Sequence, residues 1–89
     1  MTMAKIIYSK NALKFLSKLD KKSVERIRAA IEGLAYNPPV GDIKVMQEYH
    51  DGTMRLRVGA WRVIYRNKKD RAVEIILVIE IGNRGDIYQ

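Results

Sequence analysis

Hydrophobic residues follow two different periods along this chain. The first half opens with a short apolar stretch, Lys5–Tyr8, which predicts a strand. Ser9 follows and can cap a helix that runs to about Leu19, because a serine oxygen accepts a hydrogen bond from the first free backbone N–H groups of a helix. The residues expected on its apolar stripe are Leu13, Leu16 and Leu19.

A second helix is predicted directly after the first. Asp20 can cap it, and helical spacing of apolar residues continues from Lys21 to about Tyr36. Pro38 ends the pattern, because proline lacks a backbone N–H and restricts the residue before it. The stripe expected to face the core consists of Val24, Ile27, Ile31 and Leu34.

The second half changes to a period of two, which is typical of half-buried strands. Two alternating runs, 53–58 and 61–66, flank Gly59 and Ala60. This pair fits a two-residue hairpin turn with glycine at its first position. The predicted register pairs Val58 with Trp61, Arg57 with Arg62, and Arg55 with Ile64.

The remaining strands are less regular. A short strand is possible at 44–47, and the polar residues 67–70 are interpreted as a turn. A long strand, apolar on both faces at its centre, is expected over 72–81, with Gly82 breaking it. A first strand, two helices and a strand meander indicate one α+β domain, residues 1–89, with a two-helix hairpin packed on a small antiparallel sheet.

Arginines gather on one face of the predicted hairpin. Between Gly52 and Lys69 the chain has basic side chains and no acidic ones. Like charges directly opposite each other destabilise a sheet, so their retention indicates binding to a polyanion. Arginine suits this role because its planar guanidinium meets phosphate through two hydrogen bonds. The register places together Arg55, Arg57, Arg62 and Arg66.

The composition agrees with this interpretation. Seventeen Lys and Arg against 10 Asp and Glu give a net charge of +7, which favours an acidic partner or nucleic acid. The absence of cysteine excludes disulfides and thiolate metal sites, and it is compatible with the reducing cytoplasm, where we expect the protein. No apolar stretch is long enough for a membrane span, and no secretory signal is evident.

The usual catalytic constellations are absent from the sequence. His50, the single histidine, stands beside Asp51 in a predicted loop and is interpreted as a solvated residue. No spacing of histidine and carboxylates indicates a metal site, and no glycine-rich loop opens a helix. Glu80, near the end of the last strand, is interpreted as a surface or partner-facing residue. Trp61 is expected in the core, on the same strand face as Val63 and Tyr65.

The order of these features resembles a known family. The most specific parts are the strand Trp61-Arg62-Val63-Ile64-Tyr65-Arg66 and the ending Ile81-Gly82-Asn83-Arg84-Gly85-Asp86-Ile87-Tyr88. Together with the strand, helix pair and long apolar strand, they are similar to the RelE branch of the RelE/ParE toxin superfamily. The resemblance covers nearly the whole chain.

This resemblance implies a bacterial or archaeal toxin of a type II toxin–antitoxin system. Such toxins enter the ribosomal A site and cut the bound mRNA. The ribose 2′-hydroxyl attacks the adjacent phosphate, so neither a metal nor another cofactor is required. The implied partners are the ribosome with its rRNA and mRNA, and a cognate acidic antitoxin protein.

The resemblance also assigns roles to residues. Arg62 matches the arginine expected to hold the scissile phosphate, and Arg84 the one expected to stabilise the transition state or protonate the leaving oxygen. Tyr88 matches a tyrosine expected to stack on or orient the substrate. Arg55 falls where the family has one of two basic strand residues; the other is Thr53 here, which leaves the general base open. Contacts to RNA are expected from Arg57, Arg66 and Lys44.

Two other functions stay open at this stage. A ParE-like protein would inhibit DNA gyrase by binding it, without catalysis, and the shared fold does not distinguish the two. A degenerate toxin would survive only as a module that binds an antitoxin or RNA. A separate alternative applies to Arg57 and Arg66, which can also be interpreted as ordinary solvated strand residues, since exposed charge on a sheet is common.

Overall fold

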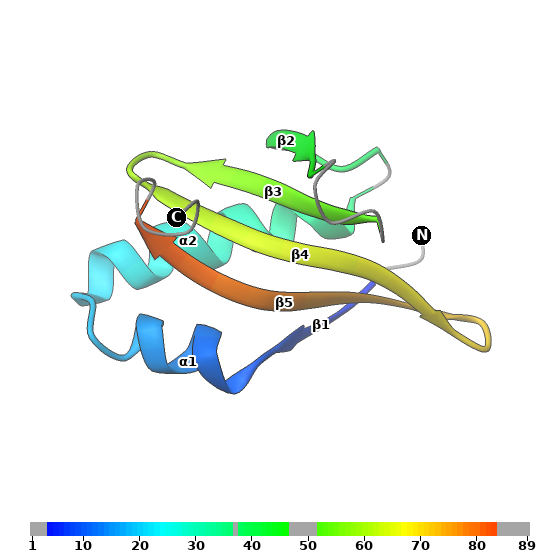
Figure 1. Cartoon of the computed structure of the whole chain (residues 1–89), viewed down its shortest axis with the longest axis horizontal. Coiled ribbons are helices and arrows are strands. Elements are labelled where there is room, and N and C mark those ends of the chain that lie inside the picture. The colour runs from blue at the N-terminus through cyan, green and yellow to red at the C-terminus, as the bar shows by residue number, and fades with distance from the viewer. Residues whose placement is uncertain (1–3, 37, 47–51, 84–89) are drawn as a thin grey trace.

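A five-stranded mixed sheet with two helices forms the domain (Figure 1). The computed structural model describes residues 4–36, 38–46 and 52–83. The elements in chain order are β1 (Lys5–Tyr8), α1 (Lys10–Leu16), α2 (Lys21–Glu32), the 3₁₀ turn η1 (Gly33–Ala35), β2 (Asp42–Val45), β3 (Thr53–Val58), β4 (Trp61–Asp70) and β5 (Val73–Asn83). The spatial order is β1-β5-β4-β3-β2. The α+β class is therefore confirmed.

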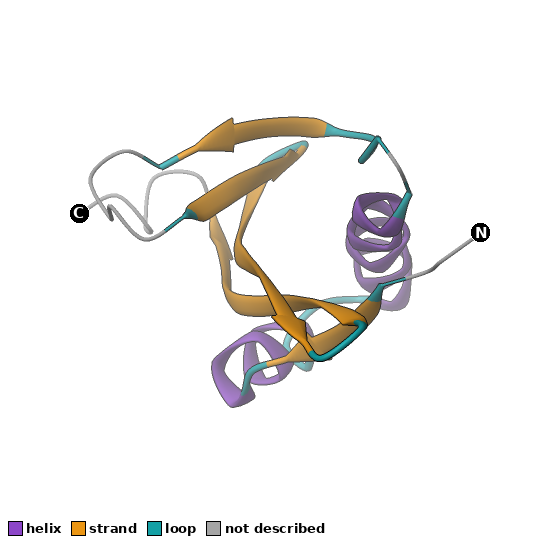
Figure 2. Cartoon of the chain, turned by 90° about the vertical axis from the view of Figure 1, so that its right-hand side faces the viewer, coloured by secondary structure: helices purple, strands orange, loops and turns teal. Residues whose placement is uncertain are grey.

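The sheet combines an antiparallel meander with one parallel strand. Strands β2 to β5 pair antiparallel in sequence order, and β1 pairs parallel with β5 at the edge. The sheet is strongly curved, and α2 lies along its concave side (Figure 2). We call this concave side the inner face of the sheet and the opposite side its outer face.

Both helices begin at the predicted caps. The Ser9 hydroxyl oxygen accepts a hydrogen bond from the Ala12 backbone N–H, and an Asp20 carboxylate oxygen accepts one from the Ser23 N–H. Helix α1 is shorter than predicted and ends at Leu16. Its apolar stripe also differs, because Ala12 is buried and Leu13 is 50% exposed.

Helix α2 follows the prediction more closely. Ile27 and Ile31 are fully buried, Leu34 lies buried in η1, and Val24 packs partly buried against the same core. The inner face of the sheet supplies the other half of this core. The sheet residues buried in this core are Leu56, Val58, Val63, Tyr65, Ile76, Val78 and Ile81. Trp61 is partly buried against them, as expected.

The predicted turn at 67–70 is wrong. Strand β4 continues through these residues to Asp70, and the chain turns at Arg71 and Ala72 instead. In this part of β4 the side chains on both faces are exposed and polar. Their sequence pattern is therefore the one that usually indicates a turn. Arg71 has a φ of 59°, a left-handed conformation that side chains other than glycine adopt at a cost.

Two other strand boundaries differ from the prediction. Strand β2 covers Asp42–Val45, two residues earlier than expected. Gly82 does not break β5, because it pairs with Arg62 and the strand continues to Asn83. A glycine weakens a strand but does not end it where a neighbouring strand supplies backbone hydrogen bonds.

A β-bulge interrupts the ladder between β4 and β5. Tyr65 pairs with Val78 and Ile64 pairs with Glu80, so Ile79 is the extra residue. The Ser9 hydroxyl donates a hydrogen bond of 2.6 Å to the Ile79 carbonyl oxygen. The same side chain therefore caps α1 and binds the backbone of the bulge.

Candidate functional site

The β3–β4 hairpin has the register predicted from the sequence. Val58 pairs with Trp61, Arg57 with Arg62, and Arg55 with Ile64. Gly59 has a φ of 58°, whereas Ala60 does not have a positive φ, as in a type II′ turn. The arginines on the outer face of this hairpin form a surface that we call the arginine face. It consists of Arg55, Arg57, Arg62 and Arg66.

The arginine face places like charges directly opposite each other across the strands. Arg57 lies opposite Arg62, and Lys44 of β2 lies opposite Arg55. Each such pair opposes sheet formation. Burial in the core below therefore has to offset this repulsion, which favours a role for the cations outside folding.

Strand β2 also brings a carboxylate to this face. Asp42 pairs with Arg57 in the ladder, and its two carboxylate oxygens lie 3.4 Å from an Arg55 nitrogen and 3.8 Å from an Arg57 nitrogen. Arg55 donates a further hydrogen bond of 3.3 Å to the Asp42 carbonyl oxygen. Asp42 was not predicted from the sequence, because only the pairing of β2 with β3 reveals it.

The four arginines differ in accessibility. Arg55 is only 8% exposed and is held by Asp42, whereas 39% of the Arg57 side chain is exposed. Arg62 and Arg66 are half-buried, and Lys44 is exposed. A phosphate approaching the sheet therefore reaches Arg57, Arg62 and Arg66 more easily than Arg55.

Thr53 has a structural function in place of a charge. It is fully buried and pairs with Arg66 across the hairpin. The Arg66 guanidinium donates a hydrogen bond of 3.4 Å to the Thr53 hydroxyl oxygen. The threonine thus orients a neighbouring cation and is itself inaccessible to substrate.

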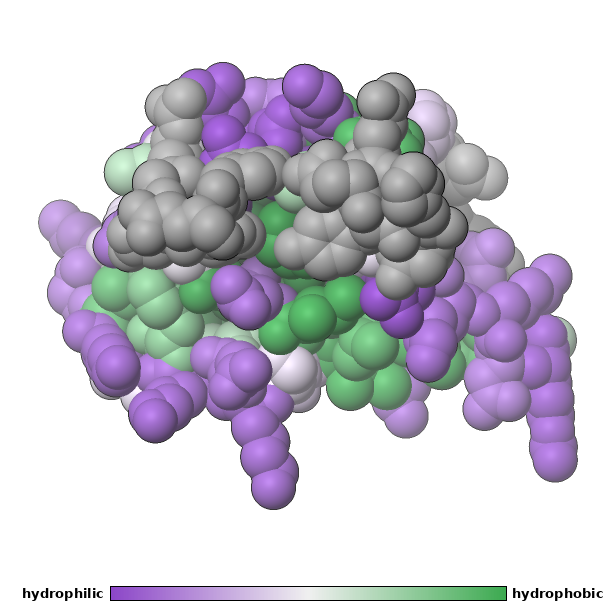
Figure 3. All heavy atoms as spheres, viewed as in Figure 1, coloured by the Kyte–Doolittle hydropathy of each residue, from purple (hydrophilic) through white to green (hydrophobic). Residues whose placement is uncertain are grey.

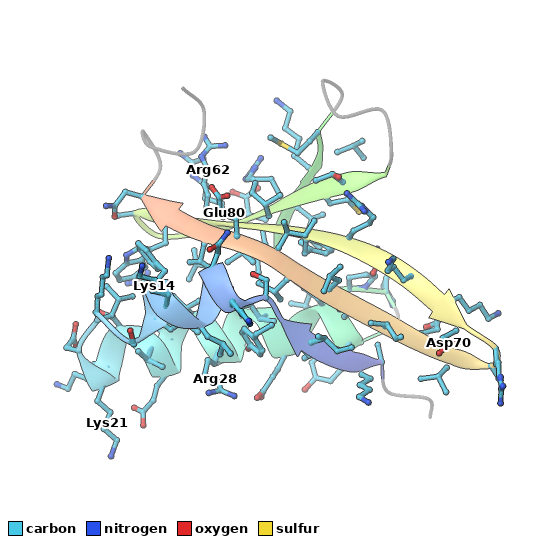
Figure 4. The ribbon with its side chains drawn as sticks, turned by 60° about the horizontal axis from the view of Figure 1, so that its bottom comes forward. Lys14, Lys21, Arg28, Arg62, Asp70 and Glu80 are labelled. Carbon is cyan, nitrogen blue, oxygen red and sulfur yellow. The ribbon has the colours of Figure 1, made fainter. Side chains whose placement is uncertain are left out.

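A second carboxylate, Glu80 of β5, borders the arginine face. It lies opposite Ile64, and Gly82 two residues later lies opposite Arg62. Figure 4 shows Glu80 between Arg62 and Lys14 of α1. A groove between α1 and β5 is lined by Lys14, Lys18 and Glu80, among others. The sequence predicted only a surface or partner-facing position for Glu80, and the bulge is what brings it here.

Apolar side chains share the outer face with these charges. One row across the strands joins Arg66, Leu77 and Ile7, of which Ile7 is 38% exposed. Figure 3 shows hydrophobic side chains grouped between charged ones on this face. The surface is therefore basic and amphipathic.

The tyrosines Tyr8 and Tyr65 lie away from the arginine face. Burial raises the pKa of Tyr65, which packs in the core. Burial also raises the pKa of Tyr8, and the Arg28 guanidinium, 5.2 Å from the centre of its ring, partly offsets this. Within 4–36, 38–46 and 52–83, no cluster of His, Asp and Glu could hold a metal ion.

A comparison with known families decides the identity of the domain. Residues 6–88 match the sequence profile described as ParE toxin of type II toxin–antitoxin system, parDE. The chain belongs to this toxin family. It is thus a type II toxin of the RelE/ParE superfamily. No curated protein sequence matches it.

Solved toxin structures share the fold of this ParE-family chain. The RelBE2 toxin–antitoxin complex of Mycobacterium tuberculosis matches with a TM-score of 0.72 and 19% identity over 93% of this chain and 100% of the other. The RelB–RelE complex of Methanococcus jannaschii matches with a TM-score of 0.70 and 25% identity, over 92% of this chain and 94% of the other. A YoeB/ParE toxin of Agrobacterium tumefaciens matches with a TM-score of 0.71 and 20% identity, over 90% of this chain and 98% of the other.

Some residues singled out in the sequence lie outside the described part of this toxin. These are Arg84, Tyr88, His50 and Asp51. The roles assigned to Arg84 and Tyr88 stay predictions. In the described part, no helix has the length and hydrophobicity that a membrane crossing requires.

Proposed function

We propose that this toxin is a ribosome-dependent mRNA endonuclease, acting in the cytoplasm. The observation that carries the proposal is the arginine face, where Arg57 and Arg62 lie directly opposite each other in the paired strands of a hairpin. Cleavage by a 2′-hydroxyl concentrates negative charge on the phosphate that it attacks. Cations fixed in position before the reaction stabilise that charge most effectively.

Arg62 has the most favourable position for holding the phosphate. It is half-buried, which limits its motion, and Gly82, the residue opposite it, carries no side chain. Arg57 opposite it and Arg66 further along the same strand face supply additional contacts to the RNA backbone, with Lys44 at the edge. Arg55 positions Asp42 and Arg57 more than it contacts substrate, because it is buried and paired. Arg84 and Tyr88 complete the site as the resemblance to RelE implies.

Gyrase inhibition is the second candidate, and two observations favour it. The matching family profile is that of ParE toxins. Thr53, at one of the basic positions of the RelE pattern, is uncharged and buried. A non-catalytic inhibitor needs the basic surface but no proton transfer.

Mapping of mRNA ends by primer extension in cells that express the chain tests the proposal. We expect cuts inside translated codons, spaced in the reading frame, that disappear when translation initiation of the reporter is blocked. Intact mRNA together with arrested replication and DNA breaks would instead support gyrase inhibition. Intact mRNA with no growth arrest would support the degenerate binding module.

The proposed antitoxin has a suitable docking groove at the other end of the sheet. This groove lies between η1 and the end of the β4–β5 hairpin; its lining includes Leu34, Tyr36, Lys68, Lys69 and Ile75. Tyr36 is 55% exposed, and the charged lining consists of Lys68 and Lys69 with one carboxylate, Glu74, so that the groove has a positive surplus. An amphipathic segment could bury its apolar side there while its carboxylates meet the lysines. The partner should therefore be acidic.

Copurification tests this docking site. We expect an acidic protein encoded beside this chain to copurify with it and to restore growth. Replacing Lys68 and Lys69 together by Glu should weaken the complex at least tenfold, because two attractive contacts become repulsive. The matched control replaces Lys21 and Lys22, which are exposed at the start of α2, by Glu in the same way. Equal weakening in both double variants would contradict this groove, and full binding by both would do so as well.

A further inference from the structure

The proposed reaction needs a group that accepts a proton from the 2′-hydroxyl. Lysine and arginine in their charged forms donate hydrogen bonds and accept none. Thr53 is fully buried, so it is inaccessible to the ribose. The groups on the described outer face that can accept a proton beside the arginines are the carboxylates of Asp42 and Glu80.

The two carboxylates differ in their engagement. Asp42 is already engaged, because its two carboxylate oxygens lie close to the guanidinium groups of Arg55 and Arg57. Glu80 is exposed, and among the described residues no hydrogen bond or ion pair engages its carboxylate. Glu80 is therefore the more available acceptor.

The β-bulge is what places Glu80 on this face. In a regular ladder continued from the Tyr65–Val78 pair, Ile79 would lie opposite Ile64, and Glu80 opposite Val63 on the inner face. The extra residue reverses this arrangement, so that Ile81 is buried in the core and Glu80 points outward. The hydrogen bond from Ser9 to the Ile79 carbonyl oxygen stabilises the bulge.

The spacing suits one phosphodiester linkage. Arg62 lies opposite Gly82, and Glu80 is the neighbour of Gly82 on the same face, so Arg62 and Glu80 are diagonal neighbours. Diagonal positions on adjacent strands are separated by about 7–8 Å, which long side chains can span from both sides. Gly82, which lies opposite Arg62, adds no side chain between the two groups. Among the residues that the structure describes, the charged groups around Glu80 are Arg62 from β4 and Lys14 and Lys18 from α1.

We propose that Glu80 is the proton acceptor for RNA cleavage at the arginine face. The inference rests on the proposed nuclease function. The Glu80 carboxylate takes the proton of the 2′-hydroxyl while the 2′-oxygen forms a bond to phosphorus. The bond from phosphorus to the 5′-oxygen breaks, and that oxygen takes a proton from water, whose hydroxide in turn takes the proton from Glu80. The products are a 2′,3′-cyclic phosphate and a 5′-hydroxyl, with Arg62 balancing the charge on the phosphate.

The test uses Glu80→Gln in a single-turnover cleavage assay on ribosomes programmed with a defined mRNA. We expect the rate to fall by about 10²–10⁴-fold, the usual contribution of a positioned acid or base. Affinity for the ribosome should rise or stay constant, because a negative charge is removed from a basic surface. The residual rate should increase tenfold per pH unit, since hydroxide replaces the missing base, whereas Glu80→Asp should retain part of the activity.

Glu25→Gln is the matched control, because Glu25 is exposed on α2 away from the outer face. It should cleave at the wild-type rate. If the wild-type chain cleaves and the Glu80→Gln variant cleaves at a rate within threefold of wild type, the role of Glu80 is overturned and the nuclease function stays intact. A wild-type chain that does not cleave on programmed ribosomes would overturn both. Circular dichroism and thermal unfolding confirm that each variant is folded.

Discussion

Arg62→Ala is expected to lower the single-turnover rate of mRNA cleavage by about 10²–10³-fold. This corresponds to about 3–4 kcal/mol of transition-state stabilisation, the usual cost of removing one fixed donor to a developing charge. Arg62 is half-buried on a strand and lies opposite Gly82, and a water molecule in place of its guanidinium would carry no positive charge. Cleavage rates measured with every ribosome occupied by the toxin report the loss of catalysis separately from any loss of binding.

Arg57→Ala provides the contrast on the same hairpin. Its side chain is 39% exposed, so we expect weaker binding and a smaller salt dependence, with a cleavage rate close to wild type. For single-stranded RNA, each phosphate that the protein no longer neutralises reduces the slope of log affinity against log salt by about 0.7. Arg71→Gly removes the same charge far from the arginine face and should change neither quantity. A folded Arg62→Ala variant with full activity would exclude Arg62 from the reaction.

Ile27→Ala should destabilise the domain by about 3 kcal/mol. Ile27 is fully buried where α2 packs on the sheet, and removing a large core side chain leaves a cavity that costs about 2–5 kcal/mol. A domain of this size has a total stability of only about 4–13 kcal/mol, so a large share would be removed. Equilibrium unfolding in urea measures the difference directly.

Leu13→Ala is the control for that experiment. Leu13 belongs to the apolar stripe predicted for the first helix, yet it is 50% exposed. We expect its free energy of unfolding to change by no more than about 0.5 kcal/mol, as for other surface substitutions. Equal destabilisation by both substitutions would contradict the packing described here for α1 and α2.

The hairpin was predictable because one local signal determined it. Gly59 fixes the turn, and the period of two then assigns each side chain to a face. The helix caps Ser9 and Asp20 could likewise be predicted from the residues next to them in the sequence. Family membership followed from motifs close together in the sequence, such as the strand around Arg62.

The carboxylates of the site were less accessible to sequence reasoning. Asp42 joins the arginines only through the pairing of β2 with β3, and β2 is too short for a clear period. Glu80 depends on one bulged residue in a strand whose centre is apolar on both faces. In such a strand, a shift of the pairing by one residue leaves the hydrophobic pattern almost unchanged, but it moves every side chain to the opposite face of the sheet.

The exposed end of the β4–β5 hairpin shows a related limit. Polar residues there occupy both faces of a paired strand, a pattern that usually indicates a turn. Pairing in this region depends on backbone hydrogen bonds, which side-chain periodicity does not report. The position of the turn at Arg71 was therefore missed.

The parallel contact between the first and the last strand has a consequence for biosynthesis. Lys5 pairs with Ile75 and Tyr8 with Val78, and β5 lies between β1 and β4 in the sheet. Contacts between such distant residues form late and slowly, because the intervening chain must first be ordered. A nascent chain that lacks β5 can neither complete its sheet nor place Glu80 beside Arg62. The proposed nuclease site can therefore assemble only after β5 has left the ribosome that made it.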